Sequence, residues 1–213
     1  MLTVHHLGIS QSDRIVWLCE ELEIPYKLVR YDRDPVTMLA PAAYKALHPM
    51  GTAPVIFDGD LVLSESGAII EYLIHKYGGG RLAVGPSAPN YPDYLFWFHF
   101  ANGSMMPSQM VGIIASMLGA DASSPNVQAL QSRAEIAYKL IEDRLGKAKY
   151  FAGDEFTAAD IIMSFSLTTM RGFVPHDLTS CPNLRAYLQR VGARPAYQRA
   201  VAKGDPGMTP NLT

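Results

Sequence analysis

Three short segments hold most of the residues that could do chemistry. They are Ser-Gln-Ser-Asp-Arg at residues 10–14, His-Pro-Met-Gly-Thr-Ala-Pro at 48–54 and Leu-Ser-Glu-Ser at 63–66. Each lies where a predicted strand meets a helix or a loop meets a strand, and such junctions place ligand contacts at the ends of a sheet. The serine hydroxyls can donate hydrogen bonds to an anion or cap a helix, and the residues alone fit both interpretations.

Several other chemistries have no motif in this chain. It contains no Gly-rich phosphate loop, no His-Glu-x-x-His and no Gly-x-Ser-x-Gly. The six histidines are scattered, and the adjacent His5 and His6 point to opposite faces of a predicted strand, so they cannot share one ion. Cys19 and Cys181 form no Cys-x-x-Cys, which argues against zinc or dithiol redox chemistry. We therefore expect no metal.

Composition excludes further classes of protein. Of 213 residues, 48% are apolar and 18% charged, which predicts one large or two small globular domains. The 18 Lys and Arg residues against 20 Asp and Glu residues give a net charge of -2, so no nucleic-acid partner is expected. The most apolar stretch, 110–120, has about half of the ~20 residues needed to span a bilayer. Because no secretory signal is apparent, we expect a cytoplasmic protein without a membrane partner.

The chain divides near residue 78, where a Gly/Pro/Ser-rich linker begins. We predict domains at 1–80 and 88–213. In the first, Ile15, Leu18, Cys19 and Leu22 have the i, i+3, i+4, i+7 spacing of a buried helix face. Strands are predicted at 2–6, 26–31, 55–57 and 61–63, the last two joined by an Asp-Gly turn. With a helix at 69–77, the order β-α-β-(α)-β-β-α predicts a mixed four-stranded sheet.

The second half is predicted to be all-helical. A long helix is expected at 90–118 with a kink at Pro107, and another at 125–145. A third begins at Thr157, which with Asp160 forms a capping-box pattern. Pro182 fits the first turn of a further helix.

Four segments together resemble the glutathione transferase family. They are Pro-x-Gly-x-x-Pro-Val followed by Asp-Gly, then Leu-x-Glu-Ser-x-Ala-Ile-x-x-Tyr-Leu, then Phe-Ala-Gly-Asp-Glu-Phe-Thr-Ala-Ala-Asp at 151–160, and Arg-Pro-Ala-Tyr at 194–197. They cover nearly the whole chain in the family's order. The resemblance implies an α/β plus all-α fold, with a thioredoxin-like N-terminal domain, a helical C-terminal domain and a cytosolic homodimer. The first two implications agree with the element pattern above.

By position, Ser10 resembles the hydroxyl that activates the glutathione sulfur in serine-type members, which carry Ser-x-x-x-Arg as here with Arg14. A thiol of pKa ~8.5 must lose ~2 units, or ~2.7 kcal/mol, to be largely ionised at neutral pH. A hydroxyl hydrogen bond to an anion contributes ~1.5–3 kcal/mol and a helix N-terminus ~0.3–1 kcal/mol. Together these suffice without a metal or general base. Ser12 is the alternative hydroxyl, and helix capping by Ser10 is the alternative role.

The resemblance also assigns glutathione contacts. Pro54 resembles the family's cis-proline, which exposes the backbone of Ala53, beside Thr52, to the cysteinyl residue of glutathione. Glu65 and Ser66 would hold the γ-glutamyl end, its ammonium on the carboxylate and its carboxylate on the hydroxyl and helix N-terminus. The alternatives are an ordinary strand start and a serine helix cap.

One contact has no assignment. The residues just before Pro54 include Gly51 and Thr52 and no basic residue that could hold the glycyl carboxylate of glutathione. Arg33 and Lys45 are candidates from the preceding loop, and both fit equally well as solvated charges.

The electrophile is expected in a hydrophobic pocket between the domains, above Ser10. The candidates are Ile9, Tyr94, Phe98, Met105, Met106 and Phe173, all of which also fit a hydrophobic core. The resemblance implies conjugation of the glutathione thiolate to hydrophobic electrophiles, a detoxification activity with glutathione as co-substrate. Alternatives on the same scaffold are a glutathione-dependent peroxidase, isomerase or dehalogenase, or a non-enzymatic glutathione-binding interaction module.

Overall fold

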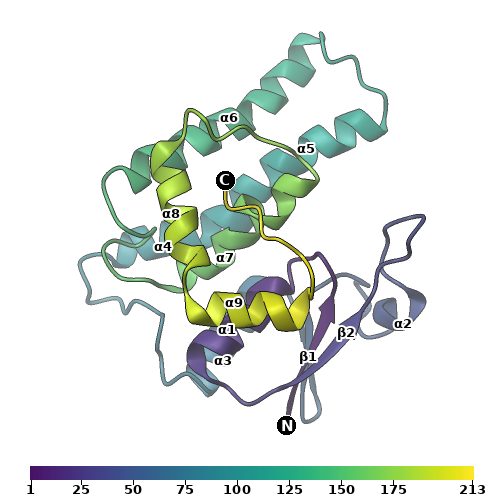
Figure 1. Cartoon of the computed structure of the whole chain (residues 1–213), viewed down its shortest axis with the longest axis vertical. Coiled ribbons are helices and arrows are strands. Elements are labelled where there is room, and N and C mark those ends of the chain that lie inside the picture. Colours follow the sequence, from purple (N-terminus) through teal and green to yellow (C-terminus); the bar gives the residue numbers. More distant parts are fainter. The chain divides into compact units, whose positions relative to one another are not determined.

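The computed structural model describes all 213 residues and contains two compact units. One unit comprises Met1–Ala83 and Gly192–Pro210, and the other comprises Val84–Val191 and Asn211–Thr213. Residues 192–210, which the sequence placed in the helical domain, therefore pack with the N-terminal unit. Figure 1 shows the course of the chain through both.

The first unit has a thioredoxin-like arrangement around a mixed four-stranded sheet. Its elements are β1 (Leu2–Leu7), α1 (Asp13–Leu22), β2 (Lys27–Tyr31), α2 (Ala42–Lys45), β3 (Val55–Asp58), β4 (Leu61–Ser64), α3 (Ser66–Lys76) and α9 (Pro195–Gly204). The strand order is β2-β1-β3-β4, with β1 parallel to β2 and antiparallel to β3. The predicted Asp-Gly hairpin joins β3 to β4, and Gly59 adopts the positive φ of 62° that such a turn requires.

Burial of alternate side chains fixes the position of β1 between two layers. Leu2, Val4 and His6 share one face of the strand and are all buried. On the other face, Leu7 packs in a cluster with Tyr44 and Val55. The predicted apolar stripe of α1 is fully buried as expected. A strand buried on both faces leaves little freedom to the loop that joins it to α1.

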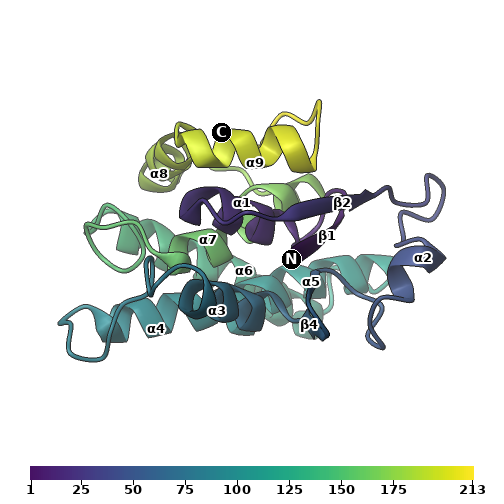
Figure 2. The ribbon, with the colours of Figure 1, turned by 90° about the horizontal axis from the view of Figure 1, so that it is seen from below.

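Helix α9 was not predicted as a separate element. It begins at Pro195 and runs alongside α1, as Figure 2 shows. The Trp17 and Tyr197 rings meet edge to face with centroids 4.9 Å apart. Three ion pairs add to this packing: Arg194–Glu21, Arg199–Glu20 and Lys203–Glu20. Helix α9 is thereby fixed against α1 within the first unit.

The second unit is helical, as predicted. Its elements are α4 (Tyr91–Phe100), the π-helical segment η1 (Ala101–Met105), α5 (Met106–Met117), α6 (Pro125–Leu145), α7 (Ala158–Leu167), the 3₁₀ segment η2 (Thr169–Gly172) and α8 (Pro182–Gly192). The irregularity expected at Pro107 lies just before it instead, in η1. Pro107 itself occupies the first turn of α5, where its missing N–H leaves no bond unmade. No helix of the protein is both long and apolar enough to cross a membrane.

The predicted capping box at the start of α7 is present and extends into a buried network. Asp160 accepts hydrogen bonds from the backbone N–H groups of Thr157 at 2.8 Å and Phe151 at 3.0 Å. It also accepts one from the Tyr187 hydroxyl at 3.2 Å. Burial raises the pKa of Asp160 to about 6, although these donors oppose that shift.

We expect Asp160→Ala to lower the free energy of unfolding by about 3–5 kcal/mol, because it leaves buried donors without an acceptor. Chemical denaturation followed by circular dichroism measures this. Asp154→Ala, in the same loop region but exposed, is the matched control and should change stability by less than ~0.5 kcal/mol. Equal stability of the two variants would contradict a structural role for the Asp160 network.

Candidate functional site

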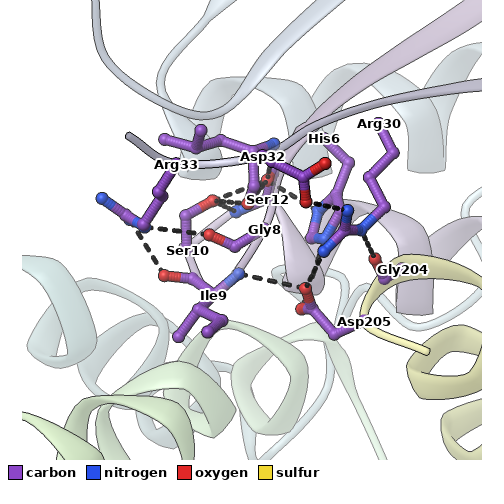
Figure 3. A network of polar contacts seen from close by, with 11 residues as sticks. His6, Gly8, Ile9, Ser10, Ser12, Arg30, Asp32, Arg33, Gly204 and Asp205 are labelled. Carbon is purple, nitrogen blue, oxygen red and sulfur yellow. Dashed lines mark hydrogen bonds and ion pairs between the residues drawn. The ribbon is translucent and has the colours of Figure 1, made fainter. Parts of the chain in front are cut away.

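The loop between β1 and α1 is held in an unusual conformation. Ile9 has a φ of 54°, in the left-handed region that β-branched residues rarely adopt. The Arg33 guanidinium donates to the carbonyls of Gly8 and Ile9, both at 2.9 Å, and to that of Met38 at 2.7 Å. From the other side, the Ile9 N–H donates to Asp205 Oδ1 at 3.1 Å (Figure 3). Two charged side chains therefore fix the backbone that leads into residue 10.

Ser10 and Ser12 follow this turn at the N-terminus of α1. Ser12 is at the N-cap but its side chain makes no capping hydrogen bond. The Ser10 hydroxyl donates to the Leu7 carbonyl at 2.6 Å, and its oxygen lies 2.7 Å from Ser12 Oγ. Ser12 has no exposed surface, whereas Ser10 retains 4%. Ser10 Oγ also accepts from the backbone N–H of Ser12, the N-cap of α1, at 3.3 Å, so its oxygen contacts the helix start while its hydrogen does not. Ser10 is the more accessible hydroxyl.

Behind the two serines lie a histidine and an aspartate that sequence reasoning did not connect with them. His6 Nδ1 is 2.8 Å from Ser12 Oγ, and His6 Nε2 is 3.3 Å from Asp205 Oδ2. Burial alone would raise the pKa of Asp205, but the contacts with His6, Ile9 and Arg30 hold it below its usual range. His6 and Asp205 come from opposite ends of the chain, so no local pattern could have paired them.

A glycine permits this approach of α9 to β1. A Cβ added at Gly204 would lie 3.2 Å from His6 Nε2, closer than most real Cβ contacts. Arg30 donates to the Gly204 carbonyl at 2.7 Å, and one of its terminal nitrogens lies 3.7 Å from Asp205. The end of α9 is thus positioned by β2 as well as by β1.

Arg14 joins the first and third sequence segments. Its guanidinium is fully buried and donates to Gln11 Oε1 at 2.8 Å and to Ser66 Oγ at 3.2 Å. Burial lowers the pKa of Arg14 to about 10, so the side chain remains protonated at neutral pH. The start of α3 is therefore tied to the loop that carries Ser10.

The second segment is joined to the third in the same way. The Ala53–Pro54 peptide bond is cis, as the resemblance implied. Ser64 donates to the Pro54 carbonyl at 3.0 Å. Pairing of β3 with β4 begins at Val55, so Ala53 and the exposed Thr52 lie just outside the ladder.

Glu65 immediately precedes α3 with a φ of 74°, another left-handed value in a residue other than glycine. Such strained positions concentrate at ligand sites. Its carboxylate is exposed and has no hydrogen-bond or ion-pair partner, whereas Ser66 beside it is buried. The pair presents a free anion next to the N–H groups of a helix N-terminus.

The two cations proposed for the glycyl end differ in their surroundings. Arg33 is committed to three backbone carbonyls of neighbouring loops. Lys45, at the end of α2, is exposed, has no hydrogen-bond or ion-pair partner and passes its alkyl stem along Gly51. Lys45 is therefore the cation of the two that is free to meet a ligand.

The predicted pocket residues fall into two groups. Ile9 and Phe173 are exposed and Met106 is half-buried. Tyr94, Phe98 and Met105 are buried, and the Tyr94 and Phe98 rings pack with centroids 5.7 Å apart. The assignment of these six residues to a pocket stays a prediction.

No group of three His, Cys, Asp or Glu side chains gathers anywhere in the structure in a way that could hold a metal ion.

Comparison with known proteins supports one family. Family models described as "Glutathione S-transferase, N-terminal domain" and "Glutathione S-transferase, C-terminal domain" match residues 10–76 and 104–195. Glutathione S-transferase 3 of Schizosaccharomyces pombe is 32% identical, over 95% of this chain and 88% of that protein. Glutathione S-transferase 3 of Zea mays is 30% identical, over 89% and 87%. The crystal structure of a glutathione S-transferase from Actinobacillus pleuropneumoniae matches with a TM-score of 0.88 and 31% identity, over 100% and 99% of the two chains. The chain belongs to the glutathione S-transferase family.

Proposed function

We propose that this glutathione transferase holds the sulfur of glutathione as a thiolate on the Ser10 hydroxyl and directs it at a hydrophobic electrophile. The observation that carries this proposal is the hydrogen bond from the Ser10 hydroxyl to the carbonyl of Leu7. The hydrogen of Ser10 is used in that bond and is not needed by the helix that follows. The hydroxyl can therefore turn toward an incoming anion at the positive end of α1 without uncapping that helix.

The energy required is within reach of this arrangement. A free thiol of pKa ~8.5 is only a few per cent ionised at neutral pH, and the thiolate is the nucleophile. A hydrogen bond from the hydroxyl to the thiolate contributes about 1.5–3 kcal/mol, which corresponds to a thiol pKa lower by one to two units. Cys19 offers no competing thiolate, because it is fully buried and burial raises its pKa. The conjugation reaction is thereby favoured over cysteine-based thiol transfer.

The remaining parts of glutathione have matching groups in the same unit. The γ-glutamyl ammonium would meet the free carboxylate of Glu65, and the γ-glutamyl carboxylate would meet Ser66, whose hydroxyl is held by Arg14. The backbone of Ala53, with Thr52 beside it, lies next to an unpaired strand start and would pair with the cysteinyl residue. Lys45 would hold the glycyl carboxylate, the contact for which the sequence offered two candidates.

The setting of the reaction belongs to the same proposal. The electrophile would be a small hydrophobic molecule, and the activity a detoxification carried out in the cytoplasm without a metal.

The chain would act as a homodimer. An apolar groove of about 330 Å³ between α5 and α6 supports a second copy, since its lining includes Phe100, Pro107, Val111, Ile136 and Leu140. Ile136 is 65% exposed there, which costs free energy unless another surface covers it.

We expect Ser10→Ala to lower kcat/KM for conjugation of a chlorinated nitrobenzene about 10- to 100-fold, because it removes the donor to the thiolate. Ser12→Ala should cost less, since Ser12 does not reach the surface. Ser87→Ala, at an exposed serine outside the site, is the matched control. If Ser12→Ala abolished turnover while Ser10→Ala retained it, the thiolate contact would belong to Ser12.

Lys45→Met should raise KM for glutathione about tenfold and leave kcat nearly unchanged, because the lost ion pair binds ground state and transition state alike. Glutathione esterified on its glycyl carboxylate should show no such difference between wild type and variant. Lys147→Met, another exposed lysine, is the control. An equal rise in KM for glutathione and for its glycyl ester in Lys45→Met would exclude this contact.

Ile136→Glu should shift the protein from dimer to monomer in sedimentation velocity, since it places a charge in an apolar contact. Val36→Glu, at an exposed residue of the other unit, should leave the mass unchanged. A monomeric wild type, or an unchanged dimer in Ile136→Glu, would contradict the proposed interface.

A further inference from the structure

The buried polar chain behind Ser10 has more members than anion stabilisation needs. A single hydroxyl suffices to donate to a thiolate, yet Ser12, His6 and Asp205 continue the chain into the protein interior (Figure 3). All are 5% exposed or less. Buried polar groups destabilise a fold unless they are paired. Burial of this row of polar side chains therefore costs folding free energy, and holding the loop in place does not by itself explain that cost.

The direction of each hydrogen bond follows from the carboxylate at one end. Asp205 only accepts, and its Oδ2 lies 3.3 Å from His6 Nε2, which makes no hydrogen bond in this geometry; the nearby carboxylate favours the tautomer that carries the imidazole hydrogen on Nε2. Nδ1 is then an acceptor, and Ser12 must donate its hydrogen to it across 2.8 Å. Ser12 Oγ accepts from the Leu7 N–H at 3.1 Å and has no hydrogen left for Ser10. Across the 2.7 Å contact between the serines, Ser10 is therefore the donor.

This polarity conflicts with donation from Ser10 to a thiolate. Ser10 has one hydrogen, which is shared in the free protein between the Leu7 carbonyl and Ser12 Oγ. If that hydrogen turned to sulfur while Ser12 continued to donate to His6, the two serine oxygens would face each other at 2.7 Å with no hydrogen between them. The conflict disappears if every hydrogen bond in the chain reverses.

We propose that His6, oriented by Asp205, receives the proton that the bound glutathione thiol loses, and that Ser10 and Ser12 relay it. The proposal rests on the proposed function of Ser10. The thiol hydrogen passes to Ser10 Oγ, the Ser10 hydrogen passes to Ser12 Oγ, and the Ser12 hydrogen passes to His6 Nδ1. One S–H bond breaks and one N–H bond forms, while both serines remain neutral hydroxyls.

In the product state each transferred hydrogen has an acceptor. Ser10 donates to the thiolate, Ser12 donates to Ser10, and His6 Nδ1 donates to Ser12. His6 is then an imidazolium whose Nε2–H still faces the Asp205 carboxylate, so charges form in pairs. Arg30, Arg33 and the exposed Asp32 are the other charged groups near this site. Arg30 pairs with Asp32 and Asp205, and Arg33 donates to backbone carbonyls. His6 is thus a positioning and proton-accepting residue that never touches the substrate.

Proton counting tests the relay in the wild-type protein. Titration calorimetry of glutathione in buffers of different ionisation enthalpy gives the protons released on binding, and S-methylglutathione, which has no thiol proton, supplies the baseline. Thiolate formed is measured by its ultraviolet absorbance in the same complex. At neutral pH we expect the wild-type protein to release less than half a proton to solvent for each thiolate that it forms. One proton released per thiolate would overturn the relay and leave the proposed role of Ser10 intact.

Two variants with a matched control identify the acceptor. His6→Asn keeps an oxygen acceptor for Ser12 but cannot take a proton, so the thiolate fraction at neutral pH should fall about tenfold. The remaining thiolate should release one proton each. Asp205→Asn, which keeps the acceptor for Ile9 N–H, should show the same change in smaller degree. His5→Asn, on the opposite face of β1 and bonded to Tyr31, should behave as wild type.

The outcomes separate the two proposals. An unchanged thiolate fraction in His6→Asn would overturn the role of His6 while Ser10 retained its own. A wild-type complex without thiolate would overturn the proposed role of Ser10, and the relay with it. If His6→Asn failed to fold, the wild-type proton count and Asp205→Asn would still decide.

Discussion

The carboxylate of Asp205 holds the centre of the N-terminal unit together. One oxygen accepts the Ile9 N–H and the other faces His6, so a single side chain fixes both the end of β1 and the loop that follows it. Ile9 would not remain in a left-handed conformation without such external support, because a β-branched residue is strained there. The position of Ser10 is thereby a consequence of where α9 ends.

That dependence makes the packing of α9 on α1 a functional requirement. Glu20 is buried, but its partners Arg199 and Lys203 are about half exposed, so each pair contributes little by itself. The edge-to-face contact of Trp17 with Tyr197 removes much more apolar surface from water and is the larger contribution. The ion pairs fix the register of the helix along α1, and this register brings Gly204 and Asp205 to the His6 ring.

Local patterns predicted what depends on neighbours in sequence. The stripe of α1, the Asp-Gly hairpin and the Thr157–Asp160 capping box are all set by residues a few positions apart, and all are present. The π-helical segment before Pro107 lies inside the single long helix that the sequence predicts. Helix α9 was not predicted, although Pro195 in its first turn and the buried Ala196 and Ala200 four residues apart are local helix signals. The pairing of Asp205 with the first loop spans 196 residues for Ile9, and only the folded chain brings these groups together. Arg14 belongs to the Ser-x-x-x-Arg motif, but its hydrogen bond to Ser66, 52 residues away, forms only in the folded chain.

The burial of Ser10 restricts where the proton of a bound thiol can go. A thiol in bulk water gives its proton to solvent, whereas Ser10 is almost closed to water and Ser12 is closed entirely. In such a site the anion and the departing proton are both poorly solvated, and separating them is costly at low dielectric. An internal acceptor with its own carboxylate avoids that separation, because each new charge forms beside an opposite one or a donor. A hydroxyl at a helix N-terminus accounts for how the anion is held, and the His6–Asp205 pair accounts for where its proton can go.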